Sequence, residues 1–133
     1  MKTITNLIST TLAVLFCTIS TAQIKNAKTQ TVTIQGNCGM CKSTIDKAGT
    51  KKKISAVTWN KDTKAATLTF DSQKTSEDEI LKRIALSGYD NDKFLAPDDV
   101  YAKLNSCCQY ERTKRVPNKA EVTNEHKHDH STT

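Results

Sequence analysis

Apolar and polar residues alternate in three short stretches of the chain, and this period of two is typical of half-buried β-strands. The stretches cover residues 31–35, 54–59 and 66–70, with a bulge expected after the first residue of the second stretch. Turn-forming residues at 60–63 separate the second stretch from the third, so we expect these two strands to pair as antiparallel neighbours. A fourth, weaker strand is predicted within residues 89–96.

Two further stretches repeat their apolar residues every three to four positions, which indicates amphipathic helices. The first begins at Cys41 and ends near Gly49, because glycine tolerates the left-handed conformation at a helix C-terminus. The second follows the capping box Ser76–Glu79 and ends at Gly88. The element order over residues 31–96 predicts an α+β fold, a ferredoxin-like βαββαβ sandwich with both helices on one face of the sheet.

The chain continues beyond this sandwich in two segments of different character. Residues 97–112 predict a short C-terminal helical extension, whose apolar face can dock on the domain, followed by a Cys-Cys segment. Residues 113–133 are polar and charged without apolar periodicity, and we predict that they form a disordered, histidine-containing tail.

The N-terminal residues 1–22 have the pattern of a secretory signal peptide, with a charged start at Lys2, a short apolar run and small residues before a cleavage point after Ala22. The apolar run is shorter than the roughly 20 residues that span a bilayer. We therefore expect an exported protein, periplasmic or extracellular, without stable membrane insertion after cleavage. Residues 23–30 are then a polar leader, and Cys17 is removed with the signal.

The net charge of the chain indicates which macromolecules it can bind. The chain has 20 Lys and Arg residues against 14 Asp and Glu residues, a formal net charge of +6. This mild excess can steer an acidic partner protein, and the run Lys51–Lys53 predicts a solvated loop. An exported chain without interleaved basic and aromatic residues is not expected to bind nucleic acid.

The candidate chemistry is that of sulfur. Cys38 and Cys41 form a Cys-x-x-Cys pair in a glycine-flanked loop, where the N-terminus of the first helix favours thiolates. Thiolates bind soft ions, with Cu(I) as the first candidate and Hg(II), Cd(II) and Zn(II) as competitors. The same dithiol can serve a thiol–disulfide oxidoreductase, which is the alternative function. No rigid nucleophile–base pair can be placed, so hydrolase chemistry is not expected.

The second cysteine pair is Cys107 and Cys108. Adjacent cysteines do not readily chelate one ion or form an unstrained disulfide with each other. One or both can fold back to the first pair and raise the coordination number to three or four, or they can form disulfides with that pair. The tract His126-x-His128-x-His130 is a weak chelator of Cu(II), Ni(II) or Zn(II), or an incidental part of a charged tail.

The chain from Thr31 to Ala96 resembles the heavy-metal-associated domain family, which includes copper chaperones, periplasmic mercury-binding proteins and the metal-binding modules of copper-transporting ATPases. The resemblance rests on three motifs, namely Cys38-x-x-Cys41, Ile54-x-x-Val57-x-Trp59 and Gly88-Tyr89. It implies that the first cysteine pair holds a Cu(I)-like ion. It also implies that the ion passes by ligand exchange to a metal-transport or metal-accepting protein.

One departure from the family pattern concerns a methionine. The family usually reads Gly-Met-x-Cys-x-x-Cys, with the methionine packed under the loop, whereas this chain has Gly36-Asn37-Cys38 and places Met40 between the cysteines. Met40 can pack, be exposed or approach a soft ion. The sequence as a whole predicts an exported soft-metal carrier or scavenger that is not an enzyme.

Overall fold

The computed structural model describes residues 23–112 and 120–121. The predicted signal peptide, residues 1–22, and most of the predicted disordered tail lie outside the described residues. The elements in chain order are β1 (Ala27–Thr33), α1 (Gly39–Gly49), β2 (Ser55–Trp59), β3 (Ala65–Asp71), α2 (Glu77–Leu86), β4 (Phe94–Leu95), α3 (Asp98–Ala102), the 3₁₀ turn η1 (Ser106–Cys108) and β5 (Ala120–Glu121).

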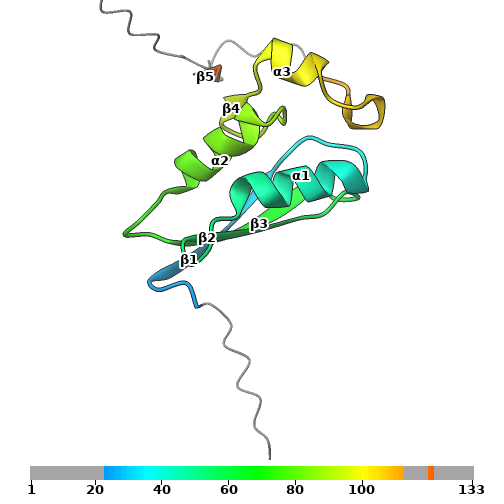
Figure 1. Cartoon of the computed structure of the whole chain (residues 1–133). Coiled ribbons are helices and arrows are strands. Elements are labelled where there is room, and N and C mark those ends of the chain that lie inside the picture. The colour runs from blue at the N-terminus through cyan, green and yellow to red at the C-terminus, as the bar shows by residue number, and fades with distance from the viewer. Residues whose placement is uncertain (1–22, 113–119, 122–133) are drawn as a thin grey trace, which may run out of the picture.

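The centre of the fold is an antiparallel three-stranded sheet in the order β1-β3-β2 (Figure 1). Successive side chains of a strand point to opposite faces, so every second residue of β2 and β3 enters the core. These core residues are Val57 and Trp59 of β2 and Ala66, Leu68 and Phe70 of β3. The predicted antiparallel pairing of the second and third strands is confirmed, and the fold is a mixed α+β structure.

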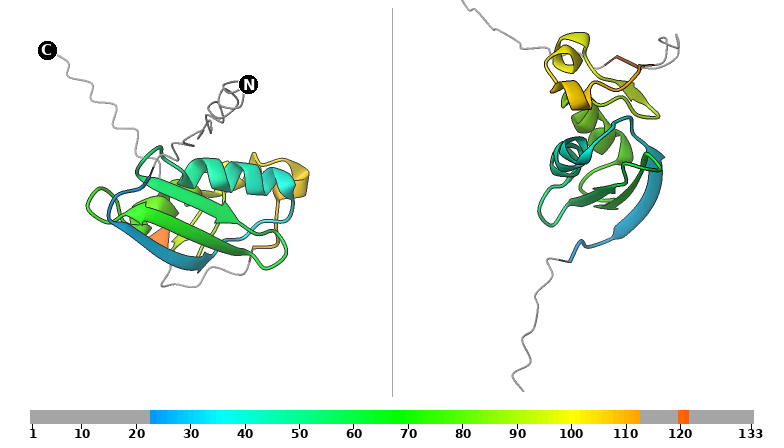
Figure 2. Two further views of the ribbon diagram at one scale, coloured as in Figure 1. Left: turned by 90° about the horizontal axis from the view of Figure 1, so that it is seen from below. Right: turned by 90° about the vertical axis from the view of Figure 1, so that its right-hand side faces the viewer.

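Both longer helices cover the same face of this sheet, as the two views at right angles show (Figure 2). Helix α1 buries Cys41 and Ile45, and α2 buries an apolar stripe that faces the sheet and α1. The predicted N-cap of α2 is present, because the Ser76 hydroxyl accepts a hydrogen bond from the Glu79 N–H at 3.2 Å. The cap satisfies a donor of the first turn that would otherwise have no partner.

The first two strands begin at residues other than those predicted. β1 starts at Ala27, so part of the predicted leader 23–30 belongs to the sheet. In that part of β1, Lys28 and Thr29 are exposed, while the backbone pairs with β3. β2 starts at Ser55 and pairs with β3 in continuous register, without the predicted bulge. Ile54 lies instead in a tight turn, where its N–H donates to the Lys51 carbonyl.

The short fourth strand predicted within residues 89–96 is confirmed as the two residues Phe94–Leu95, but it pairs in parallel with β5 and not with the three-stranded sheet. Two residues of the predicted disordered tail, Ala120–Glu121, therefore form a strand. Side chains just before β4 bind the backbone locally, since Asp90 Oδ1 accepts from the Ala96 N–H and Asn91 Oδ1 from the Phe94 N–H. Such bonds compete with a regular ladder. A bridge between Asn91 and Ile34 and a hydrogen bond from the Thr33 N–H to the Asp92 carboxylate join this segment to the end of β1.

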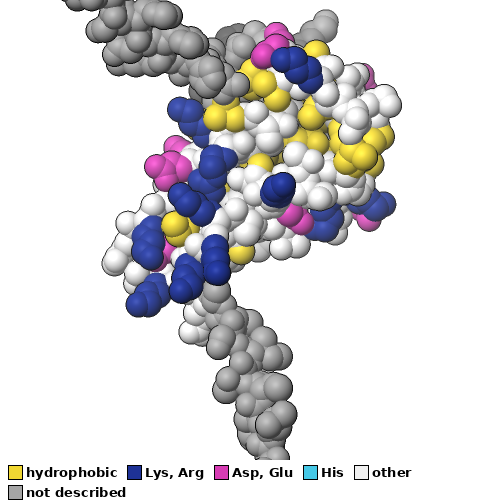
Figure 3. All heavy atoms as spheres, in the orientation of Figure 1, with side chains coloured by type: hydrophobic (Ala, Val, Ile, Leu, Met, Phe, Trp, Pro, Cys, Tyr) yellow, Lys and Arg dark blue, Asp and Glu magenta, His cyan; other side chains and the backbone are white. Residues whose placement is uncertain are grey.

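Basic side chains gather on the left of the face shown in Figure 3. Lys51–Lys53 are exposed, as predicted, at the C-terminal end of α1. A nearby groove is lined in part by the cationic residues Lys51, Lys74, Lys82 and Arg83. None of the helices within residues 23–112 combines the length and the apolar character that are needed to cross a membrane.

Candidate metal centre

The loop between β1 and α1 brings the two predicted thiols to the start of the helix. Cys38 is the N-cap residue, with an extended backbone, and Cys41 lies in the first turn. Their Sγ atoms are 3.4 Å apart. Cys41 is fully buried, whereas Cys38 is partly exposed. The Cys-x-x-Cys spacing thus places one thiol inside and the other at the surface.

Backbone groups of the loop hold the inner thiol in place. The N–H groups of Asn37 and Cys38 both point at Cys41 Sγ, each at 3.4 Å. The Cys38 carbonyl accepts the first helical hydrogen bond, from the Lys42 N–H at 3.1 Å. The position of the Cys41 sulfur therefore depends on the backbone of the loop and of the first helical turn.

Trp59 supports the loop from below. A Cβ atom at Gly36 would lie 3.0 Å from the Trp59 ring and 3.2 Å from Cys41 Cβ, so a larger residue at 36 would push the loop off the ring. The Trp59 indole N–H donates to the Ile34 carbonyl at 2.9 Å. The Lys64 ammonium donates to the Gly36 carbonyl. Glycine at position 36 allows the close approach of the loop to the indole.

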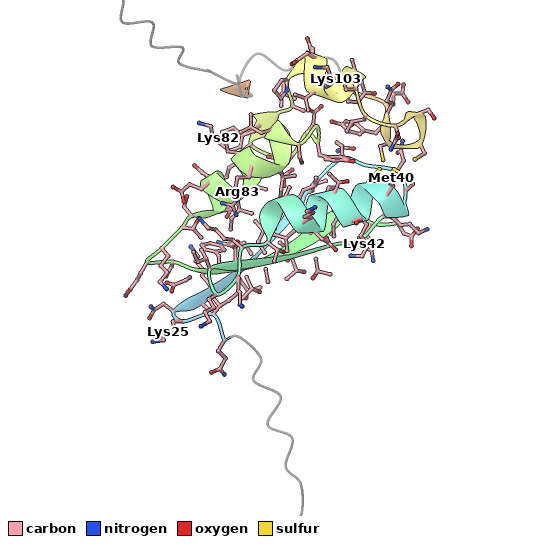
Figure 4. All side chains as sticks on the ribbon, in the orientation of Figure 1. Lys25, Met40, Lys42, Lys82, Arg83 and Lys103 are labelled. Carbon is pink, nitrogen blue, oxygen red and sulfur yellow. The ribbon has the colours of Figure 1, made fainter. Side chains whose placement is uncertain are left out.

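Met40 lies at the surface beside the thiols (Figure 4). Its side chain is 50% exposed, and its Sδ atom accepts a hydrogen bond from the Asn105 amide at 2.7 Å. Of the roles that the sequence left open, the structure therefore places Met40 at the rim and not in the core. The contact with Asn105 joins α1 to the segment that carries the second cysteine pair.

The C-terminal extension folds back onto the start of α1 (Figure 1). The turn η1 brings Cys107 Sγ to 3.1 Å and Cys108 Sγ to 3.5 Å from Cys38 Sγ. The sulfurs of Cys38, Cys41 and Cys108 all lie within 4.8 Å of one another. The four cysteines within the described residues are free thiols. Of the two arrangements that the sequence allowed, the structure has the one with the second pair folded back and not disulfide-bonded.

This three-sulfur cluster has the dimensions of a soft-metal site. With metal–sulfur bonds of about 2.3 Å, as in zinc thiolates, the sulfurs of a trigonal site lie about 4.0 Å apart. The Cys38 sulfur lies 3.4 Å from that of Cys41 and 3.5 Å from that of Cys108, so a small expansion accommodates an ion. The cluster can therefore bind a metal ion.

Tyr110 holds the returning segment in place. Its hydroxyl donates to the Gly88 carbonyl at 2.9 Å and accepts from the Asp90 N–H at 2.8 Å. Its ring packs against both Tyr89 and Tyr101. Because Tyr110 is two residues from Cys108, these contacts determine where the buried thiol lies. No motif or spacing in the sequence predicts this role for Tyr110, because its partners lie about 20 residues away in the chain.

Arg112 adds a charged anchor after Tyr110. Its guanidinium donates to both carboxylate oxygens of Asp90, at 2.9 and 2.7 Å, and to Asp98 at 2.7 Å. Because the Arg112–Asp90 ion pair is bidentate and largely buried, it fixes the orientation of the two side chains relative to each other. The sequence alone offered no spacing rule that would pair residues 22 positions apart, so this anchor was also missed.

Three of the thiols differ in acidity. The pKa of Cys38 is lowered to about 6, mainly because the backbone N–H of Cys41 donates to its sulfur and secondarily because of its hydrogen bond with the Cys107 thiol. The pKa of Cys107 is raised, chiefly because of the same hydrogen bond with Cys38. The pKa of Cys108 is raised mainly by burial. Of these three thiols, Cys38 therefore forms its thiolate first.

We predict that Cys38 is the first cysteine to be alkylated in the reduced, metal-free protein. Thiolates are the reactive form, so its iodoacetamide rate should be half-maximal near pH 6, and those of Cys107 and Cys108 should rise only in the alkaline range. Peptide mass spectrometry of protein labelled between pH 5 and 10 measures each rate. Cys107→Ala should move the Cys38 midpoint upward, and an equal midpoint for all thiols would contradict the assignment.

The predicted histidine ligands His126, His128 and His130 lie outside the described residues. No protein-family model and no curated protein sequence matches this chain.

Proposed function

We propose that this protein is an exported soft-metal carrier or scavenger that binds Cu(I) through Cys38, Cys41 and Cys108. One observation carries the proposal: the sulfur of Cys108, 70 residues after Cys38, lies with the Cys-x-x-Cys pair in one cluster. A buried thiol at the end of a folded-back segment adds a third soft ligand to a dithiol. Export follows from the signal-peptide pattern of residues 1–22.

The donor set favours Cu(I) over its competitors. Every ligand atom in the cluster is sulfur, and soft thiolates select Cu(I) among the common biological metals. Structural zinc sites are almost always four-coordinate, so three thiolates suit Zn(II) less well. Hg(II) shares the preference of Cu(I) for sulfur and is the second candidate. Metal analysis of protein purified anaerobically with equal access to copper, zinc and mercury separates these ions.

We also infer a ferredoxin-like fold and membership of the heavy-metal-associated family. The order β1-α1-β2-β3-α2, the sheet order β1-β3-β2 and the bridge from Ile34 to Asn91 support this inference. In the family pattern a methionine packs under the metal-binding loop. In this chain that position is Gly36, and the Trp59 indole packs beneath the loop in its place.

A Cu(I) ion that has only three ligands and lies near the surface can be transferred to another protein by ligand exchange. Cys38 is partly exposed and Cys107 is exposed, so a thiol of a metal-transport or metal-accepting protein can reach the ion. The third ligand strengthens the hold on the ion and slows its release. Storage or scavenging therefore fits this cluster better than rapid delivery.

The second candidate function is thiol–disulfide exchange. The low pKa of Cys38 favours it, because a thiolate near neutral pH can attack a disulfide. Thiol–disulfide exchange needs only two thiols. Metal binding by the cluster also gives a role to Cys107 and Cys108. Insulin reduction that is catalytic and is lost in Cys38→Ser would establish the oxidoreductase instead.

We predict that Cys108→Ser reduces the number of sulfur ligands of bound Cu(I) from three to two. Structural zinc sites with four ligands contribute about 10–16 kcal/mol, or roughly 3 kcal/mol per ligand, so the loss of one thiolate should weaken binding about 100-fold. X-ray absorption at one Cu(I) per chain gives the ligand number, and competition with a chelator gives the affinity. Ser106→Ala, in the same turn but without a thiol, is the matched control. An unchanged spectrum in Cys108→Ser would remove Cys108 from the site.

A further inference from the structure

The four sulfurs at the start of α1 form two triangles that share one edge. The first triangle is the cluster of Cys38, Cys41 and Cys108. The second consists of Cys38, Cys107 and Cys108, and its sides measure 3.1, 3.5 and 3.9 Å. The shared edge joins Cys38 and Cys108. Cys41 and Cys107 each belong to one triangle only.

From this arrangement we infer a second Cu(I) site, formed by Cys38, Cys107 and Cys108, beside the first. The inference rests on the proposed function, which supplies the first ion. Each Cu(I) then has three sulfur ligands, with Cys38 and Cys108 bridging the two ions and with Cys41 and Cys107 terminal. A thiolate sulfur has enough lone pairs to bind two soft cations at once.

The dimensions of the second triangle fit a three-coordinate ion. A trigonal site with bonds of about 2.3 Å has sulfur–sulfur edges of about 4.0 Å, and no side of the triangle exceeds that length. Adjacent cysteines do not readily chelate one ion by themselves, but here a third sulfur, that of Cys38, lies beside them. In η1 the sulfurs of Cys107 and Cys108 are 3.9 Å apart, and both lie within 3.5 Å of the Cys38 sulfur.

A single ion bound by all four sulfurs fits the arrangement less well. Four ligands of one ion must all be close to one another, and the sulfur of Cys107 lies against those of Cys38 and Cys108, at 3.1 and 3.9 Å, on the exposed side of the cluster. Two ions need no short distance between the sulfurs of Cys41 and Cys107. The edge-sharing arrangement therefore accommodates two low-coordinate ions without moving η1 toward the inner cysteine.

Burial distinguishes the two positions. The terminal ligand of the first ion, Cys41, is fully buried, whereas the terminal ligand of the second, Cys107, is exposed. The inner ion is thus shielded, and the outer ion is open to an incoming thiol. Four thiolates and two Cu(I) ions leave two net negative charges, which the N-terminal dipole of α1 partly offsets. We expect the outer ion to exchange first.

The number of Cu(I) ions bound per chain tests the second site. The reduced full chain is titrated anaerobically with Cu(I) supplied as its acetonitrile complex, and native mass spectrometry counts the ions bound in the presence of a competing chelator. The wild-type chain should bind two Cu(I) ions and Cys107→Ser one. A variant with His126, His128 and His130 changed to Ala should still bind two.

X-ray absorption gives a second readout. With bonds of about 2.3 Å and a shared edge of 3.5 Å, the two copper atoms lie about 3 Å apart, so a copper–copper scattering path should appear at two equivalents and be absent in Cys107→Ser.

Two outcomes overturn the second site. One is a single Cu(I) bound at saturation by both wild type and Cys107→Ser, which leaves the proposed function standing. The other is a second ion that persists in Cys107→Ser but is lost with the three histidines, because that ion belongs to the tail. Failure of the proposed function looks different: wild type then binds no more Cu(I) than a variant in which both Cys38 and Cys41 are changed to Ser.

Discussion

Replacing Cys38 and Cys41 together by Ser should lower the affinity for Cu(I) by about 10⁴-fold, because two thiolates at roughly 3 kcal/mol each are lost. The hydroxyl of Ser is a hard, neutral donor that a soft cation binds poorly. Competition between the reduced protein and a Cu(I) chelator measures the change. Retention of full affinity in this double variant would remove the Cys-x-x-Cys pair from the metal centre.

The fold should survive this double substitution, because Ser and Cys have similar volumes. Cys41 is fully buried, so a modest loss of stability from burying a hydroxyl is expected there. Far-UV circular dichroism and thermal unfolding of the metal-free protein show whether the variant is still folded. If it is, the weaker Cu(I) binding is due to the missing thiolates. Met40→Leu, a change between the two cysteines that keeps both thiols, is the matched control and should bind Cu(I) with nearly wild-type affinity.

Replacing Trp59 by Ala should lower the free energy of unfolding by about 3–5 kcal/mol, the range for removal of a buried aromatic side chain. Trp59 is 1% exposed, and its indole packs under Gly36. The loss is a large part of the roughly 5–15 kcal/mol that stabilises a typical domain. Denaturant unfolding followed by far-UV circular dichroism gives the value, since Trp59 is the only tryptophan and fluorescence would lose its probe.

Trp59→Phe separates packing from hydrogen bonding at this position. Phe keeps an aromatic ring beneath the loop but loses the indole N–H that donates to the Ile34 carbonyl. A buried carbonyl left without its donor costs about 1–3 kcal/mol, so Trp59→Phe should be less destabilised than Trp59→Ala. Equal stability of wild type and Trp59→Ala would show that the loop does not depend on the indole.

Local patterns predicted the longer strands and helices of this protein. The alternation in residues 54–59 and 66–70 predicted β2 and β3 because one face of each strand is buried, and Ser76 predicted the start of α2 because a hydroxyl there accepts from the Glu79 N–H. The short fourth strand also exists, but it pairs with β5 and not with the three-stranded sheet. Asp90 and Asn91 bind the backbone next to β4, and no periodicity in the sequence signals those bonds.

The sequence by itself determined the first half of the site, because three residues of spacing at a helix N-terminus place the sulfurs of Cys38 and Cys41 within one helical turn of each other. It left the position of Cys107 and Cys108 open, because their approach depends on contacts between residues far apart in the chain. Only the tertiary structure decided it. Tyr110 and Arg112 bind the segment that begins at Gly88, and these distant contacts carry the second pair of sulfurs back to the first.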